Sequence, residues 1–304
     1  MAFGKGAEST EGGFKRYIGI ASVKVLALNP NKEELEKLYG RTLENAPEYI
    51  GETEVGEDKH KVAQVRLDFI VQADPEKYTE ADGSPLNFVN RVSLFVRNEY
   101  RENKDNTKVQ VIDKYGRTAW VSKEDAQNHV IPTYSNGPAN IDKDYRPAYY
   151  GEEELIKFLI AYLNIPACQR YVDGKWVMND ASKLPDSEAM IENIPALFKG
   201  DFSELRNIIG YQPNNKVKVM FGIRTADDNK QYQTVYTRMF LKNNVTDYSR
   251  LDADLAAARE AGSFANTEFD TADLHEYVVV SSSFSQQPAT PAAAPKTPWG
   301  AKQQ

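Results

Sequence analysis

Apolar and polar residues alternate in the stretch Phe88-Val89-Asn90-Arg91-Val92-Ser93-Leu94-Phe95-Val96-Arg97-Asn98-Glu99-Tyr100. Successive side chains of a strand point to opposite faces, so Val92, Leu94 and Val96 share one face. The other face carries Arg91, Ser93, Phe95 and Arg97. The stretch predicts a half-buried strand with cations on its polar face.

The same alternation appears on both sides of this stretch. Residues 62–71 place Val65, Leu67, Phe69 and Val71 on one side, which predicts a strand. Residues 108–112 follow a polar hairpin tip, and residues 118–121 follow the turn at residues 114–117. We therefore predict an antiparallel meander of consecutive strands.

Other elements are predicted from caps and periodicity. Strands are expected at residues 16–28, 217–224 and 232–242, with an edge strand at 277–280. Helices are expected at residues 31–39, 151–163, 202–209 and 249–261. Asn31 is placed to cap the first helix and Gly40 to end it. Residues 44–58 and 122–144 are expected to be loops.

Three strands, a helix and then a hairpin follow the order of a five-stranded OB barrel. We predict a mostly β, α+β protein: an OB-fold-like antiparallel barrel built mainly from residues 62–242, to which the N-terminal strand and helix are an addition. Residues 14–280 form this domain, with insertions at 122–150 and 167–210. Residues 1–13 are expected to be flexible, and 281–304 a disordered Pro/Ala/Gln tail. A mixed α+β sheet and a β-sandwich are the alternatives.

Composition excludes several classes of protein. The chain has 304 residues, and we find no apolar run near the ~20 residues of a membrane helix. Its first residues lack the apolar segment of a secretory signal, so we expect a cytoplasmic protein, in the bacterial host if a phage encodes it. Cys168 is the only cysteine, and His60, His129 and His275 are far apart. We expect no disulfide, no metal and no other cofactor.

Charge is distributed unevenly along the chain, although the net charge is −7. Residues 85–121 contain seven basic and four acidic residues. Residues 214–242 contain six basic and two acidic residues. Residues 247–276 reverse this, with eight acidic residues against two arginines. The strands are positive and the segment after them is negative, which favours a basic groove on an acidic body.

Motifs of enzymes are missing from the sequence. We find no P-loop, no nucleophile elbow, no zinc-protease motif and no dinucleotide fingerprint. The run Glu152-Glu153-Glu154 opens a predicted helix, where carboxylates interact favourably with the helix dipole. We therefore expect a protein without catalytic residues.

Cations next to aromatic residues favour a flexible polyanion with flat rings, because phosphates bind cations and unstacked bases bind aromatic faces. The candidates for nucleic-acid contact on the meander and the following loop are Arg91, Arg97, Tyr100, Arg101, Lys108, Lys114, Tyr115, Arg117, Trp120, Tyr145, Arg146 and Tyr149. Those on the later hairpin are Lys216, Lys218, Arg224, Tyr232, Tyr236 and Arg238. The alternative is that these residues are solvated strand faces and ordinary core or rim aromatics.

Three segments carry a resemblance to a known family: Phe14-Lys15-Arg16-Tyr17-Ile18-Gly19-Ile20, Lys114-Tyr115-Gly116-Arg117-Thr118-Ala119-Trp120, and Tyr145-Arg146-Pro147-Ala148-Tyr149-Tyr150-Gly151-Glu152-Glu153-Glu154-Leu155. The chain resembles single-stranded DNA-binding proteins of tailed bacteriophages, particularly crAss-like phages, over approximately residues 14–245. The resemblance implies an OB-fold protein that coats replication or recombination intermediates without catalysis.

The C-terminal tail departs from many single-strand binders, whose acidic tails recruit replication proteins. Here Lys296 and Lys302 are its only charges, and recruitment of replication proteins through Trp299 in the tail at residues 281–304 is a further hypothesis. Two other functions stay open. A phage structural or assembly protein would use its sheet edges to meet other subunits, and an enzyme would need titratable groups that converge in a pocket.

Overall fold

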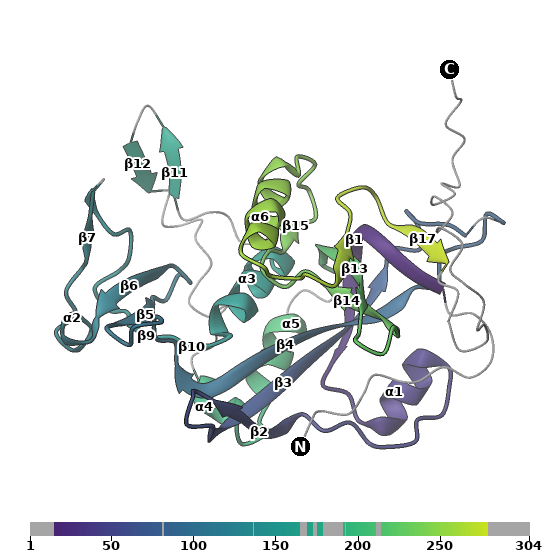
Figure 1. Cartoon of the computed structure of the whole chain (residues 1–304). Helices are drawn as coiled ribbons and strands as arrows, with labels where there is room; N and C mark the ends of the chain where they lie inside the picture. The colour runs from purple at the N-terminus through teal and green to yellow at the C-terminus, as the bar shows by residue number, and fades with distance from the viewer. Residues whose placement is uncertain are drawn as a thin grey trace.

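The computed structural model describes residues 15–80, 82–135, 137–164, 169–172, 175–178, 191, 193–210 and 214–278. A curled antiparallel sheet forms a half-barrel, with strands in the order β10-β4-β3-β1-β13-β14 (Figure 1). The strands span Lys15–Leu28 (β1), His60–Ala73 (β3), Val89–Tyr100 (β4), Tyr149–Tyr150 (β10), Lys216–Thr225 (β13) and Gln231–Val235 (β14). The prediction of a mostly β protein with a few helices is confirmed.

β1 lies in the middle of the sheet, between β3 and β13. The prediction that this strand is an addition to the barrel is wrong. Ile20 faces a cluster formed with helix α6 (Ser249–Glu260), whereas Ala21 and Val23 face the main core. A strand covered on both faces is apolar along most of its length, as in Tyr17-Ile18-Gly19-Ile20-Ala21.

Short strands extend the sheet at its margins. β2 (Ile50–Val55) pairs with β3, and β17 (His275–Val278) pairs with β1. β15 (Leu241–Lys242) and β16 (Thr267–Phe269) both pair with β13. The loop predicted at residues 44–58 therefore contains a strand, and the strand predicted at 232–242 ends after Val235 and resumes only at β15.

The predicted meander does not continue past β4. β5 (Lys108–Ile112), β6 (Thr118–Ser122) and β9 (Arg146–Pro147) form a separate sheet in the order β6-β5-β9. The free side of β4 is occupied by β10, where Tyr149 pairs with Tyr100 and Tyr150 with Arg97. Beyond β6 lie the short helix α2 (Lys123–Gln127) and a hairpin of β7 (Thr133–Tyr134) and β8 (Gly137–Pro138). The loop predicted at residues 122–144 is therefore partly structured.

Helices cover the inner face of the half-barrel. α3 (Glu152–Tyr162), α4 (Ile194–Leu197) and α5 (Ser203–Gly210) share the main core with Leu67, Phe69 and Leu94 of the sheet. α1 (Lys32–Tyr39) begins at Asn31, whose side chain accepts a hydrogen bond from the Glu34 N–H, and ends at Gly40 with φ +65°. Both predicted caps are confirmed.

β11 (Gln169–Val172) and β12 (Lys175–Met178) pair as a further hairpin. The predictions for residues 1–13, for Cys168 and for the tail at 281–304 lie outside the described residues. Within the described part of the chain, no helix has the length and apolar character needed to cross a bilayer.

Candidate nucleic-acid interface

The outer face of β4 carries the predicted cations. Val92, Leu94 and Val96 belong to the main core, so the alternate residues point away from α3 and α5. Along this outward side lie Arg91, Phe95 and Arg97, and Arg66 of β3 is the cross-strand partner of Phe95. The predicted division of β4 into two faces is confirmed.

Four residues from three segments form an alternating row, here called the arginine–aromatic ladder: Arg97, Tyr150, Arg101 and Trp120. The Arg97 guanidinium lies 4.8 Å from the centre of the Tyr150 ring. The Arg101 guanidinium lies 5.6 Å from the same ring and 6.0 Å from the Trp120 ring. Tyr150 is 40% exposed, so its ring is open to solvent beside two guanidinium groups.

Gly151 explains how Tyr150 reaches this position. Its φ is +85°, and a Cβ built on it would lie 1.8 Å from the carbonyl oxygen of Phe95. Only a glycine combines this backbone conformation with so close an approach to β4. The turn before α3 is thereby held against β4, and Tyr150 pairs with Arg97 across the strands.

The sequence singles out the loop at residues 144–150 for nucleic-acid contact, but Tyr150 of that loop and Phe95 are not among the individually predicted residues. Phe95 is 41% exposed and lies on the same face of β4 as Arg97, so the alternation of the strand was a signal that could have identified it. Tyr150 had no such signal, because its position depends on a pairing between segments about fifty residues apart in the sequence. Tyr100, a predicted candidate, is 48% exposed and its ring lies 5.1 Å from that of Tyr149.

Carboxylates neutralise part of the positive charge. Arg101 contacts Glu153 at 2.8 Å and Glu154 at 3.7 Å, and Arg91 contacts Asp68 at 3.4 Å. Burial alone would raise the pKa of Glu153, but hydrogen bonds from Lys157 and Gln110 and the charges of Lys157 and Arg101 lower it. Among the described residues, no carboxylate lies within 4.0 Å of Arg97, which leaves this cation for a ligand.

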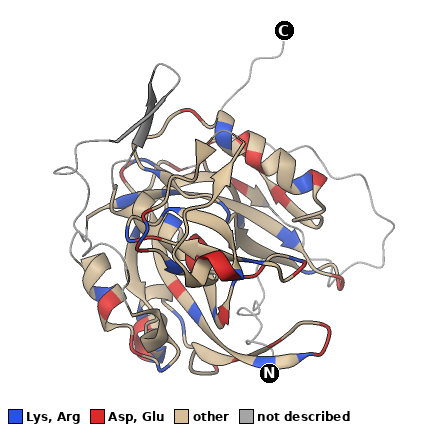
Figure 2. Ribbon diagram, turned by 90° about the vertical axis from the view of Figure 1, so that its left-hand side faces the viewer, with Lys and Arg blue, Asp and Glu red and all other residues tan. Residues whose placement is uncertain are grey.

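The β5–β6 hairpin contributes fewer free cations than predicted. Arg117 donates to the buried Asp113 carboxylate, and its side chain is only 14% exposed. Lys114 lies 3.7 Å from Asp142, and the Tyr115 ring has Lys114 at 5.2 Å and Arg117 at 4.8 Å from its centre. Lys108 is exposed. Figure 2, seen from this side of the molecule, shows basic and acidic residues interspersed along the ribbon.

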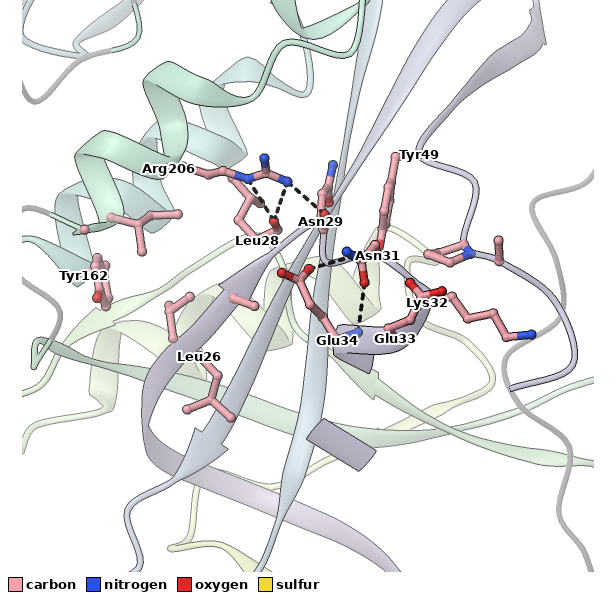
Figure 3. A pocket seen from close by; sticks show the side chains of 16 residues that line it. Leu26, Leu28, Asn29, Asn31, Lys32, Glu33, Glu34, Tyr49, Tyr162 and Arg206 are labelled. Carbon is pink, nitrogen blue, oxygen red and sulfur yellow. Dashed lines mark hydrogen bonds between the residues drawn. The ribbon is translucent and has the colours of Figure 1, made fainter. Parts of the chain in front are cut away.

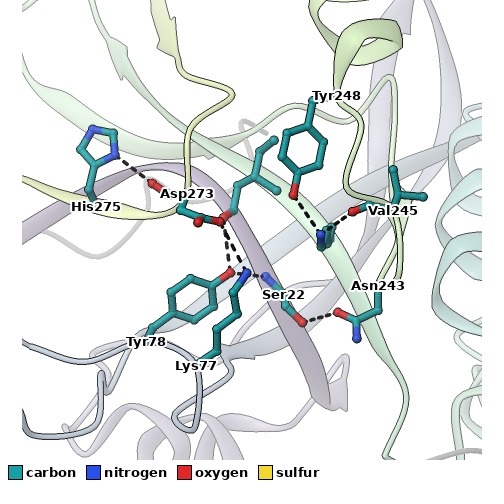
Figure 4. A network of polar contacts seen from close by, with 10 residues as sticks. Ser22, Lys77, Tyr78, Asn243, Val245, Tyr248, Asp273 and His275 are labelled. Atoms are coloured by element: carbon teal, nitrogen blue, oxygen red, sulfur yellow. Dashed lines mark hydrogen bonds and ion pairs between the residues drawn. The ribbon is translucent and has the colours of Figure 1, made fainter.

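Three predicted contact residues are buried, so they cannot form part of an exposed binding surface. The prediction that they contact nucleic acid is wrong for these three residues. Tyr145 is 1% exposed, and its hydroxyl donates to the carbonyls of Asp125 and Val130. Tyr236 is fully buried, and burial and its hydrogen bond to Asp254 raise its pKa. The Lys218 ammonium donates to the Val245 carbonyl and to the Tyr248 hydroxyl, within the polar network drawn in Figure 4.

The remaining candidates lie outside the ladder. Arg146 donates to Glu152, a fully buried carboxylate that also accepts from the Tyr149 N–H at 2.9 Å. Lys216 pairs with Asp74 and Arg238 with Asp254. Arg224 is exposed and lies 5.7 Å from the centre of the half-buried Tyr232 ring.

The two predicted groups of cations do not join in one track across the sheet. Lys216, Lys218 and Met220 share one face of β13, and Met220 on that face packs against Leu251 and Leu255 of α6. α6 and the segment before it occupy this part of the sheet. The candidate site is therefore built from β4, β10 and β6, without the later hairpin.

A cavity of about 890 Å³ lies between the end of β1, the start of α1 and α5 (Figure 3). Arg206 in its wall donates to the carbonyls of Leu28 and Asn29, and Asn31 and Glu34 hydrogen-bond each other's backbone. These polar groups have partners within the protein: Asn31 and Glu34 cap α1, and Arg206 binds the end of β1. In the described part of the chain, no group of three or more His, Cys, Asp or Glu residues is placed to hold a metal ion.

Comparisons of the chain with protein-family profiles, with curated proteins and with solved structures find no match.

Proposed function

We propose that this protein binds single-stranded DNA without sequence specificity, on an OB-like half-barrel, through the arginine–aromatic ladder. The observation that carries the proposal is the alternation of Arg97, Tyr150, Arg101 and Trp120, with Tyr150 open to solvent. Single-strand binders combine cations that follow the backbone with rings on which bases stack.

The order of five strands in the curled sheet supports an OB-like architecture. When β1, β3, β4, β13 and β14 are numbered first to fifth along the chain, they lie side by side in the curled sheet in the order third, second, first, fourth, fifth. α3 stands between the third and the fourth, as the helix of an OB barrel does. OB folds bind oligonucleotides on the face of strands two and three. In this numbering those strands are β3 and β4, the latter carrying Arg97.

The chemistry of the ladder suits a flexible strand. A base that contacts the exposed part of the Tyr150 ring would have its phosphates within reach of Arg97 and Arg101. Stacking needs only a π-face, so the contact would not depend on the identity of the base. Glu153 and Glu154 compete with phosphate for Arg101, which favours moderate affinity and release of the strand.

Binding of a fluorescein-labelled oligothymidine, followed by anisotropy at low salt, tests the proposal. Tyr150→Ala should lower the affinity by about 5- to 160-fold, which corresponds to the ~1–3 kcal/mol of one stacked base. Tyr150→Phe should retain most of the affinity, because the ring is preserved.

Tyr232→Ala is the matched control, since Tyr232 also lies under an arginine, Arg224, but outside the ladder. Its affinity should equal that of the wild type. Absence of binding by the wild-type protein at low salt would refute the proposal, and so would an equal loss in Tyr232→Ala and Tyr150→Ala.

A further inference from the structure

Charged residues gather on the outer face of β3 and β4 around one buried carboxylate. Asp68 of β3 is 2% exposed, and its carboxylate lies 3.1 Å from the Arg66 guanidinium and 3.4 Å from that of Arg91. It also accepts a hydrogen bond from the Ser93 hydroxyl at 2.7 Å. One carboxylate cannot neutralise two guanidinium groups, so positive charge remains on this face.

The segment between α1 and β2 is held against the same face. The Tyr49 carbonyl accepts from the Arg66 N–H at 2.7 Å, and the Arg66 guanidinium lies 5.6 Å from the centre of the Tyr49 ring. At the other end of this segment, the Arg41 guanidinium lies 5.6 Å from the centre of the Tyr39 ring. The segment thereby adds a third arginine to the cluster.

The Tyr39 hydroxyl is surrounded by these charges. Burial raises the pKa of Tyr39, whereas the charge of Arg91 lowers it. Asp68 raises this pKa further, and Arg41 and Arg66 lower it. Because such effects fall off with distance, all four charges lie near the hydroxyl. Three arginines against one aspartate leave a net charge of +2 around it.

Several donors of this cluster are available to a ligand. Arg41 is exposed, and in the described part of the chain no carboxylate lies within 4.0 Å of it. No described residue hydrogen-bonds the hydroxyl of the half-buried Tyr39. The Tyr49 hydroxyl, in contrast, donates to the Pro30 carbonyl at 2.6 Å. The Arg91 side chain is 38% exposed and has only the shared Asp68 as its ion-pair partner among the described residues.

We infer that Arg41, Arg91 and the Tyr39 hydroxyl form a binding site for a phosphate-type oxyanion. The forked guanidinium group matches the oxygens of a phosphate, and a phenol hydroxyl donates one further hydrogen bond. A carboxylate offers only two oxygens to these three groups, so phosphate fits the site better. Asp68 already holds Arg91, so this side chain loses less freedom when the anion binds.

A consequence of the site rests on the proposed function. Arg91 and Arg97 lie six residues apart on one face of β4, a span of about 20 Å. Phe95, which is 41% exposed, projects from that face between them. A DNA strand that crosses the ladder would continue over Phe95 and place one of its phosphates in the site. The site itself requires no DNA, and free phosphate is the other source of the same chemistry.

Isothermal titration calorimetry with inorganic phosphate, near neutral pH and at low ionic strength, tests the inference, with acetate as the comparison. One phosphate per chain should bind, about 10-fold or more tightly than acetate. Arg41→Gln and Tyr39→Phe should each weaken phosphate binding by about 10-fold, the effect of one hydrogen bond to a charged group. Arg41 is exposed, so Arg41→Gln should unfold in urea at the wild-type midpoint.

Tyr49→Phe is the matched control, because the Tyr49 hydroxyl already donates to Pro30. Its phosphate affinity should equal that of the wild type. Absence of saturable phosphate binding by the wild type would overturn the inference, and so would equal losses in Tyr49→Phe and Tyr39→Phe.

Oligothymidine anisotropy of Arg41→Gln distinguishes the two sources of phosphate. A loss of affinity by about 10-fold would assign the site to a phosphate of the DNA backbone, and an unchanged affinity would assign it to free phosphate. Tyr150→Ala should leave the binding of inorganic phosphate unchanged. Phosphate binding without oligothymidine binding would refute only the proposed function, and oligothymidine binding without phosphate binding would refute only the oxyanion site.

Discussion

Glu153 has two opposing effects on the ladder. Its carboxylate holds the Arg101 guanidinium at 2.8 Å, which keeps this cation beside Tyr150. The same contact neutralises the charge that a phosphate would bind. Its further hydrogen bond from Gln110, at 2.9 Å, links α3 to β5. Glu153 thus orients Arg101 and lowers its attraction for anions.

Glu153→Gln should raise the affinity for oligothymidine by about 3- to 10-fold, because it removes the nearer of the two carboxylates at Arg101 while the amide keeps the shape of the side chain. Anisotropy at low salt measures the change. Glu33→Gln is the control, since Glu33 is an exposed acid in the first turn of α1. An unchanged or lower affinity in Glu153→Gln would show that Arg101 does not meet the phosphates.

The pKa of Glu153 also sets the pH range of this effect. Because its folded pKa lies below the usual value, the stability from its ion pairs is present above the unfolded pKa of about 4.3 and is lost as the pH falls through the lower folded pKa. From pH 5 to 8 the carboxylate stays ionised. The affinity gain of Glu153→Gln should therefore be constant over that range.

At the scale of secondary-structure elements, one glycine determines how α3, β10 and β4 meet. Gly151 is the N-cap of α3 and has φ +85°, and its Cα lies against the backbone of Phe95. Gly262 follows α6 with a similar φ of +74°, but a Cβ there would meet nothing within 4 Å. The two glycines differ mainly in the space around them.

Gly262→Ala should lower the free energy of unfolding by about 1–2 kcal/mol, the penalty of a left-handed alanine. Gly151→Ala adds a clash with the Phe95 carbonyl, so its loss should exceed that of Gly262→Ala by about 1–3 kcal/mol. Urea unfolding measures both. An equal loss of unfolding free energy in the two variants would contradict the close approach of the Gly151 backbone to that of Phe95. Gly151→Ala should also weaken oligothymidine binding, because Tyr150 precedes it.

At the scale of the whole molecule, a net charge of −7 limits the electrostatic part of binding. The outer face of β4 and the ladder supply three cations, Arg91, Arg97 and Arg101, two of which also contact carboxylates. Several other basic candidates are paired, as Lys216 is with Asp74, or buried, as Lys218 is, whereas Lys108 and Arg224 are exposed but lie outside the ladder. We therefore expect a modest dependence of binding on salt.

We expect the logarithm of the association constant for oligothymidine to fall with the logarithm of the salt concentration with a slope of about −2. Three phosphate contacts contribute about −0.7 each. Arg97→Gln should reduce its magnitude by about 0.7. Arg250→Gln, on the exposed surface of α6, should leave it unchanged. A wild-type slope near −5 would place the binding surface elsewhere. Arg117 is unsuited to this test, because its side chain stabilises the β5–β6 turn through Asp113.

Much of the fold could be predicted where a signal is local. The strands β3 and β4 were identified from alternation, β13 from an apolar run before a hairpin loop, and α1 and α3 from caps and first-turn acids. The candidate site was predicted in part, since Arg97, Arg101 and Trp120 belong to the ladder. Tyr150 was predicted only as part of the loop at residues 144–150 and not as an individual contact, because β10 has two residues and no periodicity of its own.

Periodicity and caps are properties of neighbouring residues, and they were enough to specify which side chains share a face of β4 and where α1 begins and ends. They carry no information about what covers a face. Long-range packing placed β1 in the middle of the sheet, separated β5 and β6 from β4, and buried Tyr145, Tyr236 and Lys218. The ladder depends on this packing, because strand pairing between distant segments brings Tyr150 and Trp120 to the arginines of β4 and the turn after it.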